Sequence, residues 1–426
     1  MIIIADDLTG ANDTGVQFAK LNHETVVILT SSQENFFFGN KVSVINTDCR
    51  SLSPEDAYER SRELAEKLNT VPRPLIYKKV DSTLRGNIGQ EIDGFMDEIS
   101  FSYCAVAPAY PMNGRITIGG YHIVRGELLE DSELSGDAKF PMTESFIPVL
   151  LKDQTKRKIA QITIQQIRRG EIAEQVQSLT SEGAEIIIFD SATDEDLKTV
   201  ARFLEAEENI LWVGSAALVQ AFAENQEKLA VRKERLTFDK GAAEKSALTI
   251  AGSVSKVTRE QVAYQKEQGA YLISIHPLHL LKDEEKKMKD YFEEAKEILR
   301  CGGNLVITTL TTDESAQQLH LYTQETGAGN LELGNRIAFE LGNFGKRLID
   351  EAELAGLILT GGDIAYQTCI QLGINTLEIV GEIEEGIPLS KVIEGPHAGM
   401  LIVTKAGAFG GKQSLHKAMN FIKKEN

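Results

Sequence analysis

Short apolar runs recur along the chain, and each ends in a polar, glycine-containing turn before a segment with helical spacing. Residues 2–5 form the first run. Residues 74–77 form another, which leads through the polar stretch 78–91 to a helical pattern at 92–96. An uninterrupted apolar run is typical of a strand buried on both faces of a parallel sheet. The repeated order of strand, turn and helix therefore predicts an α/β protein with mainly parallel sheets flanked by helices.

The length of 426 residues exceeds what one hydrophobic core usually organises, so two domains are expected. The charged stretch 227–235 lacks strong periodicity and marks a shift of composition. We therefore place the two domains at residues 1–230 and 231–426, and the order of strand, turn and helix restarts at 247–262. The active site is expected in the cleft between these domains.

Charge and cysteine usage argue against several classes of protein. Lys and Arg number 45 and Asp and Glu number 63, which gives a formal net charge of −18. Surfaces that bind nucleic acid or anionic membranes need clustered positive charge, so neither partner is expected. The four cysteines are scattered without a CxxC pair, which predicts neither a disulfide framework nor a zinc site. No apolar run approaches the ~20 residues of a membrane span, and we expect a cytoplasmic protein.

The stretch 78–91 carries more chemistry than a turn requires. Its candidates for ligand contact are Lys79, Asp81, Ser82, Thr83 and Arg85. Because the stretch follows a predicted strand, these groups are expected at the carboxyl edge of the sheet, where α/β proteins bind small anionic ligands. The alternative is a solvated loop with a capping Ser or Thr.

Two adjacent carboxylates, Asp6 and Asp7, follow the first predicted strand. They repel each other and must be solvated or paired, so we expect at least one of them to be functional. The alternative is that one caps the next helix, a common role of Asp. Arg50 lies at the end of another predicted strand.

Other features of the first half are less informative. Residues 162–165 and 186–190 are predicted strands, and the polar segment 126–143 is interpreted as a loop or hairpin over the site. A lone histidine is more often packed or at the surface than catalytic, and His122 is interpreted in this way.

Three turns of small residues follow predicted strands in the second half, at 251–255, 360–363 and 406–412. Small residues let backbone N–H groups approach an anion closely, which suits phosphate. The backbone donors predicted to hold a nucleotide are those of Ser253, Gly361, Gly362 and Gly407. None of the turns matches the P-loop pattern, and the alternative for each is simple turn geometry.

Taken together, the motifs resemble those of the four-carbon acid sugar kinases, in order and over essentially the whole chain. The segments that carry the resemblance are 5–13 (ADDLTGAND), 79–87 (KVDSTLRGN), 107–111 (APAYP), 114–115 (GR), 360–363 (TGGD) and 404–410 (TKAGAFG). The resemblance implies an N-terminal sugar-acid domain, a C-terminal ATP domain and transfer of the γ-phosphoryl group to the terminal hydroxyl of a four-carbon acid. Within the family, TGANDTG at 9–15 and DSTLRGN at 81–87 are more similar to the D-threonate kinases than to the 3-oxo-tetronate kinases. Where the family pattern has Asp-Pro before residue 140, this chain has Asp-Ala-Lys at 137–139.

The chemistry of this reaction assigns roles to the candidate residues. The substrate carboxylate suits a forked, permanently charged partner, which is Arg85, Arg50 or both. The predicted substrate-binding set is Asp7, Arg50, Lys79, Asp81, Ser82, Thr83 and Arg85. A carboxylate must orient or deprotonate the reacting hydroxyl, and Asp81, Asp7 and Asp363 are unranked candidates. ATP and Mg²⁺ are the expected cofactors, with Asp363 placed in the nucleotide site and the metal ligands left unassigned.

Several alternatives stay open. The substrate could be D-erythronate or 3-oxo-tetronate instead of D-threonate. A non-catalytic sugar-acid sensor would keep Arg50 and Arg85 but would not need the glycine-rich turns of the second half. A dehydrogenase is disfavoured because the first turn lacks a GxGxxG pattern. A homodimer would be unsurprising for a chain of this class.

Overall fold

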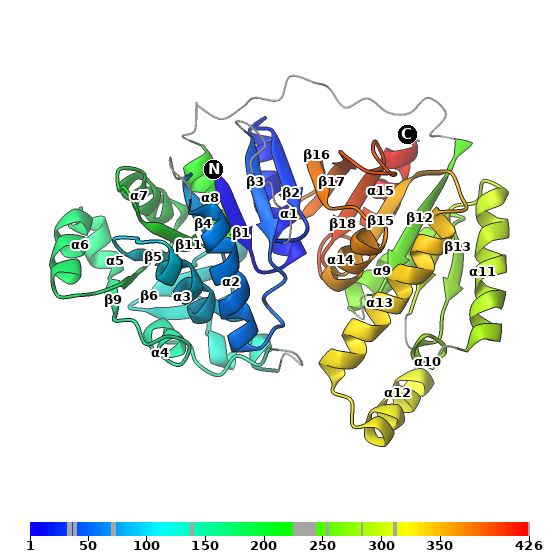
Figure 1. The fold of residues 1–426 in the computed structure, drawn as a ribbon, viewed down its shortest axis with the longest axis horizontal. Coiled ribbons are helices and arrows are strands. Elements are labelled where there is room, and N and C mark those ends of the chain that lie inside the picture. Colours follow the sequence, from blue (N-terminus) through cyan, green and yellow to red (C-terminus); the bar gives the residue numbers. More distant parts are fainter. Residues whose placement is uncertain are drawn as a thin grey trace. The chain divides into compact units, whose positions relative to one another are not determined.

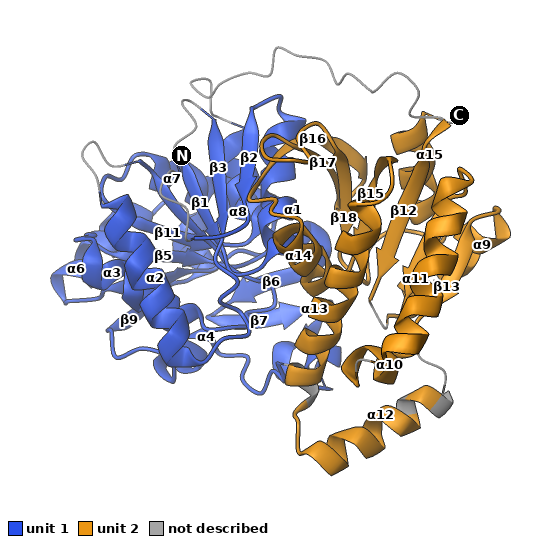
Figure 2. Cartoon of the chain, turned by 45° about the vertical axis from the view of Figure 1, so that its right-hand side comes forward, with its two compact units in different colours: residues 1–232 blue, residues 233–426 orange. Residues whose placement is uncertain are grey.

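The computed structural model describes residues 1–31, 36, 41–69, 74–136, 140–224, 244–252, 255–282, 284–309 and 313–424. The chain divides into two compact units, residues 1–232 and 233–426 (Figures 1 and 2). The domain boundary predicted at residues 230 and 231 lies outside the described residues, as does the sequence departure at 137–139.

Among the described residues of unit 1, the main sheet has eight strands in the order β2-β3-β1-β4-β11-β5-β10-β9, and every neighbouring pair is parallel. The strands are β1 (Ile2–Ala5), β2 (Thr25–Ile28), β3 (Val42–Asn46), β4 (Ile76–Lys79), β5 (Cys104–Ala107), β9 (Ile159–Ile162), β10 (Ile186–Phe189) and β11 (Leu211–Gly214). Ala5 is in register with Asn46 on one side and with Lys79 on the other. The segments that follow β1, β3 and β4 therefore begin at the same level of the sheet.

Helices flank this sheet, and most of its strands, namely β1, β3, β4, β9, β10 and β11, are followed directly by a helix. The helices are α1 (Leu8–Lys20), α2 (Pro54–Leu68), α3 (Ile88–Glu98), α4 (Ile147–Lys152), α5 (Ile164–Arg168), α6 (Ile172–Ser181), α7 (Asp194–Glu205) and α8 (Ala216–Ala223). The core between sheet and helices includes Ile4, Ile45, Ile92, Phe95 and Val106, all buried.

The strand predicted at residues 162–165 is wrong. The strand is β9, which ends at Ile162, and Thr163 begins helix α5 with a capping box. The Thr163 hydroxyl accepts from the Gln166 amide, and the Gln166 side chain accepts from the Thr163 amide. Two satisfied backbone donors favour the helix over continuation of a short β-branched run.

A second, antiparallel sheet in unit 1 has the order β6-β7-β8. Its strands are β6 (Arg115–Ile118), β7 (Tyr121–Val124) and β8 (Glu127–Leu128), and it is entered through the 3₁₀ turn η1 (Pro111–Asn113). Two further 3₁₀ turns, η2 (Leu129–Asp131) and η3 (Glu133–Gly136), follow β8. The described part of the predicted loop or hairpin at 126–143 is thus the last strand of this sheet followed by turns.

In the part of unit 2 that the structure describes, seven strands lie in the order β13-β14-β12-β15-β18-β17-β16, of which the first five are parallel and the last two antiparallel. The strands are β12 (Ser246–Ala251), β13 (Tyr271–Ser274), β14 (Leu305–Thr308), β15 (Leu354–Thr360), β16 (Thr376–Glu384), β17 (Ile387–Val392) and β18 (Leu401–Lys405). Both units confirm the predicted α/β class with mainly parallel sheets.

The helices of unit 2 are α9 (Lys256–Glu267), α10 (Pro277–Leu281), α11 (Glu285–Arg300), α12 (Asp313–Thr326), α13 (Asn330–Ile349), α14 (Gly362–Gln371) and α15 (Ser414–Lys423). One core cluster joins the buried Val306, Ile358 and Val403 of the strands to Leu415 and Met419 of α15. Among the described residues, no helix combines the length and the apolar character needed to cross a membrane.

Candidate active site

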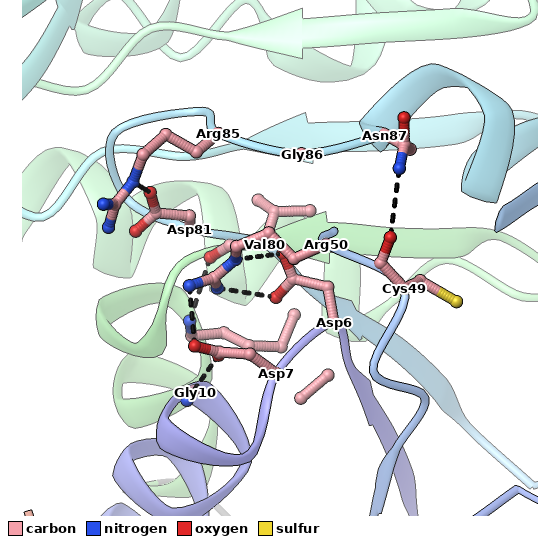
Figure 3. A network of polar contacts seen from close by, with 12 residues as sticks. Asp6, Asp7, Gly10, Cys49, Arg50, Val80, Asp81, Arg85, Gly86 and Asn87 are labelled. Atoms are coloured by element: carbon pink, nitrogen blue, oxygen red, sulfur yellow. Dashed lines mark hydrogen bonds and ion pairs between the residues drawn. The ribbon is translucent and has the colours of Figure 1, made fainter. Parts of the chain in front are cut away.

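Arg50 binds both aspartates that follow β1 (Figure 3). Its Nε and Nη2 donate to the two carboxylate oxygens of Asp6 over 2.8 and 2.9 Å, and its Nη1 donates to Asp7 Oδ2 over 2.6 Å. The other oxygen of Asp7 accepts the Gly10 amide over 2.7 Å and caps α1. The capping alternative is therefore confirmed for Asp7. The predicted contact of Arg50 with a substrate carboxylate stays a prediction.

The same arginine acts differently on the two aspartates. Burial raises the pKa of Asp6, but Arg50, Lys78 and Lys79 outweigh burial, so the pKa ends below its ordinary value. Burial raises the pKa of Asp7, and repulsion from Asp6 adds to the rise despite attraction to Arg50. Asp6 is thus a fixed anion, whereas Asp7 is the carboxylate better able to accept a proton.

The loop after β4 holds Asp81 in a tight set of donors. Asp81 Oδ2 accepts from Arg85 Nε and from the Thr83 hydroxyl, each over 2.5 Å. Burial raises the pKa of Asp81, but Arg50 and Arg85 together bring it well below its usual range. Asp81 is therefore a permanent acceptor, and the Thr83 hydroxyl, which is 3% exposed, holds that acceptor in place.

Gly86 ends this loop at a point where a side chain would not fit. Its φ of +100° lies in the left-handed region. A Cβ there would come within 3.3 Å of Asp6 Oδ2 and of Arg50 Cγ. The glycine lets the loop pass close to the Asp6–Arg50 pair.

The two lysines at the end of β4 point to opposite faces of the strand, as its period of two requires. Lys79 Nζ donates to the Val80 carbonyl over 2.9 Å, and a Cβ on Gly10 would lie 3.3 Å from it, so Lys79 faces the start of α1. Lys78 forms an ion pair of 2.8 Å with Glu91 of α3, and both side chains are buried. Burial raises the pKa of Glu91 to about 7, against the opposing effect of Lys78. Lys79 thus lies on the side of Asp7 and Gly10, where its predicted role in substrate binding stays a prediction, whereas Lys78 is paired with Glu91 on the opposite face of β4.

His122 is packed, as interpreted from the sequence. It is 0% exposed, and its Nε2 lies 2.7 Å from the Ser82 carbonyl oxygen while its Nδ1 lies 3.2 Å from the Thr117 hydroxyl. Burial lowers the pKa of His122 to about 4. The neutral ring therefore donates from Nε2 to Ser82 and ties β7 to the loop after β4.

Arg115 lies near the Asp81 loop and is a candidate that the sequence reasoning did not single out. It begins β6, is half-buried and interacts electrostatically with Asp81 and Arg85. Its Nη1 donates to the Asn113 carbonyl over 2.5 Å. The Gly-Arg pair at 114–115 was the only sequence signal that pointed to it.

At the strand ends of unit 2, the described hydrogen bonds are formed mainly by backbone amides and carbonyls. Gly361, at φ +102°, precedes α14, whose first residue is Gly362 and which has no side-chain cap. The Gly361 amide donates to the Lys405 carbonyl over 2.9 Å, so this amide is already engaged. Asp363 is exposed in the first turn of α14. Ser253 lies outside the described residues.

The Gly407 carbonyl is the anchor of the loop between β18 and α15. It accepts from the Ser255 hydroxyl over 2.6 Å, from the Thr258 hydroxyl over 2.8 Å and from Lys405 Nζ over 3.0 Å. Burial lowers the pKa of Lys405 to about 8. Lys405 and Thr258 were missed as functional candidates, although Thr404-Lys405 lies in a motif quoted above.

Comparisons with known proteins match the two halves of the chain to two different domain families. Residues 1–222 match a family model described as a sugar-binding N-terminal domain, and residues 248–415 match one described as a nucleotide-binding C-terminal domain. A solved structure of a protein from Salmonella typhimurium LT2 superimposes with a TM-score of 0.82 at 23% identity, over 99% of this chain and 98% of that one, and supports the fold alone.

Curated relatives match over nearly their full lengths. The chain is 31% identical to a D-threonate kinase of Salmonella typhimurium strain LT2, over 99% of this chain and 98% of the relative. It is 29% identical to a D-erythronate kinase of Heliobacterium modesticaldum, over 99% and 97%. It is 27% identical to a 3-oxo-tetronate kinase of Pseudomonas savastanoi pv. phaseolicola, over 98% and 96%. The chain therefore belongs to the four-carbon acid sugar kinase family, which confirms the resemblance of its motifs.

Proposed function

We propose that this kinase transfers the γ-phosphoryl group of ATP to the terminal (C4) hydroxyl of D-threonate. The observation that carries the proposal is the cluster of Asp7, Arg50, Asp81 and Arg85 at the carboxyl edge of the unit 1 sheet. Cationic groups and hydroxyl-binding carboxylates side by side suit a short sugar acid. The motifs at 9–15 and 81–87 favour D-threonate, whereas the curated relatives include kinases of all three acids.

The described contacts support a division of labour in the sugar site. Asp81, kept ionised by Arg85 and Thr83, is suited to accept hydrogen bonds from the inner hydroxyls. Ser82 is half-buried and Lys79 faces the start of α1, so both fit as further ligands. Arg85 keeps part of its guanidinium exposed, with a side-chain exposure of 27%.

Asp7 is the better candidate for the base that orients or deprotonates the reacting hydroxyl. A general base works best when its pKa approaches the working pH, and the pKa of Asp7 is raised whereas that of Asp81 is lowered. The Asp7 side chain is 23% exposed, so a ligand can reach it. We therefore assign proton acceptance to Asp7 and binding to Asp81.

The start of α14 is the proposed phosphate site in unit 2. The helix begins without a side-chain cap, so the Gly362 amide and its neighbours suit a phosphate oxygen, and the helix dipole favours negative charge there. Among the described residues, no group of three His, Cys, Asp or Glu side chains could hold a metal ion. Mg²⁺ in kinases is usually held by one or two carboxylates and the phosphates, so Asp363 fits as its protein ligand. When bound, Mg²⁺ supplies charge neutralisation at the phosphates.

Phosphoryl transfer needs little covalent help, so alignment and exclusion of water are the main tasks of the protein. The C4 hydroxyl oxygen of the sugar acid is the acceptor and must lie in line with the bond between the γ-phosphorus and the oxygen that leaves with ADP. A site between the two domains stays a prediction.

The proposal is tested by a screen of ATP consumption with D-threonate, D-erythronate and 3-oxo-tetronate, each with and without Mg²⁺. We expect ADP release that depends on the acid, is largest with D-threonate and yields a product with phosphate on C4 by ³¹P and ¹³C NMR. Binding of the acid without ADP release would identify a sensor instead. A higher kcat/KM with D-erythronate or 3-oxo-tetronate would reassign the substrate within the family.

A further inference from the structure

The small antiparallel sheet of unit 1 presents one face to the loop after β4. Thr117 of β6 is in register with His122 of β7, and Arg115 with Val124. Residues two apart on a strand share a face, so Arg115 lies on the same face as Thr117. That face is oriented by His122, whose Nε2 lies 2.7 Å from the Ser82 carbonyl oxygen.

Packing confirms which way this face points. Val124 is 3% exposed and belongs to the same buried cluster as Val80 and Leu84, which flank Asp81 in the sequence. Thr117 and His122 are both fully buried. The side chain of Arg115 therefore starts from the face that covers the Asp81 loop, in agreement with its electrostatic interaction with Asp81 and Arg85.

The arginines of the site differ in how their charge is balanced. Arg50 is paired with Asp6 and Asp7, and Arg85 is paired with Asp81. Among the residues that the structure describes, Arg115 forms no ion pair, and its one side-chain hydrogen bond goes to the neutral Asn113 carbonyl. Asp81 and Glu133 attract Arg115 without pairing with it, so of these three arginines it is the one whose guanidinium is not ion-paired.

The guanidinium of Arg115 also has unused donors. Its Nε is buried and has no hydrogen-bond partner among the described residues. A buried donor without a partner is costly, so a ligand acceptor placed there gains more than it would at the surface. Burial, together with repulsion from Arg125 and Arg85, lowers the pKa of Arg115 despite attraction to Asp81 and Glu133, so a bound anion would stabilise the charged guanidinium.

We propose that Arg115 binds the C1 carboxylate of the sugar acid and is the residue that makes the enzyme prefer an acid to a neutral polyol. The planar guanidinium matches a carboxylate through two parallel hydrogen bonds. The matching family domain is the sugar-binding one, which favours the substrate carboxylate over a nucleotide phosphate as the occupant. The inference rests on the proposed function and names the group that selects its substrate.

The test compares kcat/KM for D-threonate with kcat/KM for D-threitol, which has a CH₂OH group in place of the carboxylate. In Arg115→Met, kcat/KM for D-threonate should fall about 10- to 100-fold, the usual effect of a charge-assisted hydrogen bond. The value for D-threitol should change less than about 3-fold, so the preference for the acid collapses. Arg115→Lys should keep part of the preference because it keeps the charge without the fork.

Arg125→Met is the matched control. Arg125 belongs to the same small region, but its side chain is 67% exposed and paired with Glu133. This variant should keep the wild-type preference. Circular dichroism of each variant checks folding. Calorimetric titration of D-threonate in the absence of ATP measures binding directly, and we expect Arg115→Met to lose this binding and Arg125→Met to keep it.

Equal losses with D-threonate and D-threitol in Arg115→Met would overturn the inference and point to the phosphate instead. An unchanged titration of D-threonate would overturn it as well. Failure of the proposed function has a different signature, because the wild-type protein would then release no ADP with any of the three acids. The titration still decides the role of Arg115 in that case.

Discussion

The two units differ in the chemical groups that lie at the carboxyl ends of their strands. In unit 1 the carboxyl edge of the sheet carries opposed charges, with Arg50 between Asp6 and Asp7 and Arg85 on Asp81. In unit 2 the corresponding edge is held by a carbonyl, that of Gly407, which accepts from neutral hydroxyls and from one buried lysine. Side-chain charges can be placed to match a small, stereospecific acid, whereas backbone N–H groups, such as that of Gly362 at the start of α14, suit a phosphate.

The difference implies that substitutions in unit 1 and in unit 2 affect different substrates. The largest effect is expected at Asp7. Asp7→Asn keeps an oxygen for the Gly10 amide but removes the proton acceptor, so kcat should fall about 10²- to 10⁴-fold. Asp81→Asn is the matched variant and should mainly raise KM for the acid. Steady-state kinetics of both variants, with circular dichroism as the folding control, check this ranking. Near-native turnover of Asp7→Asn would show that the base lies elsewhere.

The charged architecture of unit 1 also predicts a stability effect. Arg50→Met leaves the carboxylate of Asp6, which is 1% exposed, without its bidentate partner and should lower the free energy of unfolding by about 3–5 kcal/mol. Trp212, in β11 of unit 1, is the single tryptophan of the chain, so its fluorescence during urea unfolding reports on this unit. Arg62→Met, which breaks partly exposed pairs, should cost less than about 1 kcal/mol. Equal changes in the free energy of unfolding in Arg50→Met and Arg62→Met would mean that water reaches the Asp6 carboxylate once Arg50 is removed.

The hydrogen bond of His122 to the loop after β4 predicts a pH dependence. The pKa of His122 is about 4 in the folded protein and 6.5 for an unperturbed histidine, so the unfolded chain binds the proton first as pH falls. Stability from this residue is present above pH 6.5 and is lost as pH falls towards 4, by about 3 kcal/mol in all. In His122→Gln the side-chain amide can still donate but does not titrate. Between pH 7 and pH 4.5, the free energy of urea unfolding should therefore fall less in the variant than in the wild type. An equal fall in both proteins would contradict the lowered pKa of His122.

Lys405 gives the smallest expected effect and tests unit 2. Lys405→Met removes the donor to the Gly407 and Ala406 carbonyls, so the loop after β18 loosens and KM for ATP should rise about 10-fold. KM for the sugar acid should not change. Lys412→Met, at an exposed lysine of the same loop, is the control and should leave both constants unchanged. A rise in KM for the acid in Lys405→Met would contradict the proposal that unit 2 binds ATP and unit 1 binds the acid.

Structural features that depend on neighbouring residues alone could be predicted from the sequence. The apolar run at residues 2–5 predicted a strand, and β1 occupies those residues. The run at 74–77 also predicted a strand, but β4 lies two residues later, at Ile76–Lys79. The strand predicted at 162–165 failed because a capping box of two side chains outweighed the β-branched residues around it. Local pattern also shows why Lys78 and Lys79 diverge, since successive strand residues alternate in direction.

Pairings between distant residues could not be predicted. Nothing near Arg50 in the sequence indicates that Asp6 and Asp7 share its guanidinium, because that contact depends on the register of β1 and β3. The proposed role of Arg115 depends on a small sheet that His122 joins to the loop after β4. Gly361 was predicted as a phosphate donor, and its engagement with the Lys405 carbonyl follows from the pairing of β15 with β18.

The buried pair of Lys78 and Glu91 has a consequence for the loop that carries Asp81. It joins β4 to α3 on either side of that loop, and opening the pair would leave two desolvated charges apart. The ends of the loop are therefore held at a fixed separation, and the backbone that presents Asp81, Ser82 and Thr83 is constrained from outside the site.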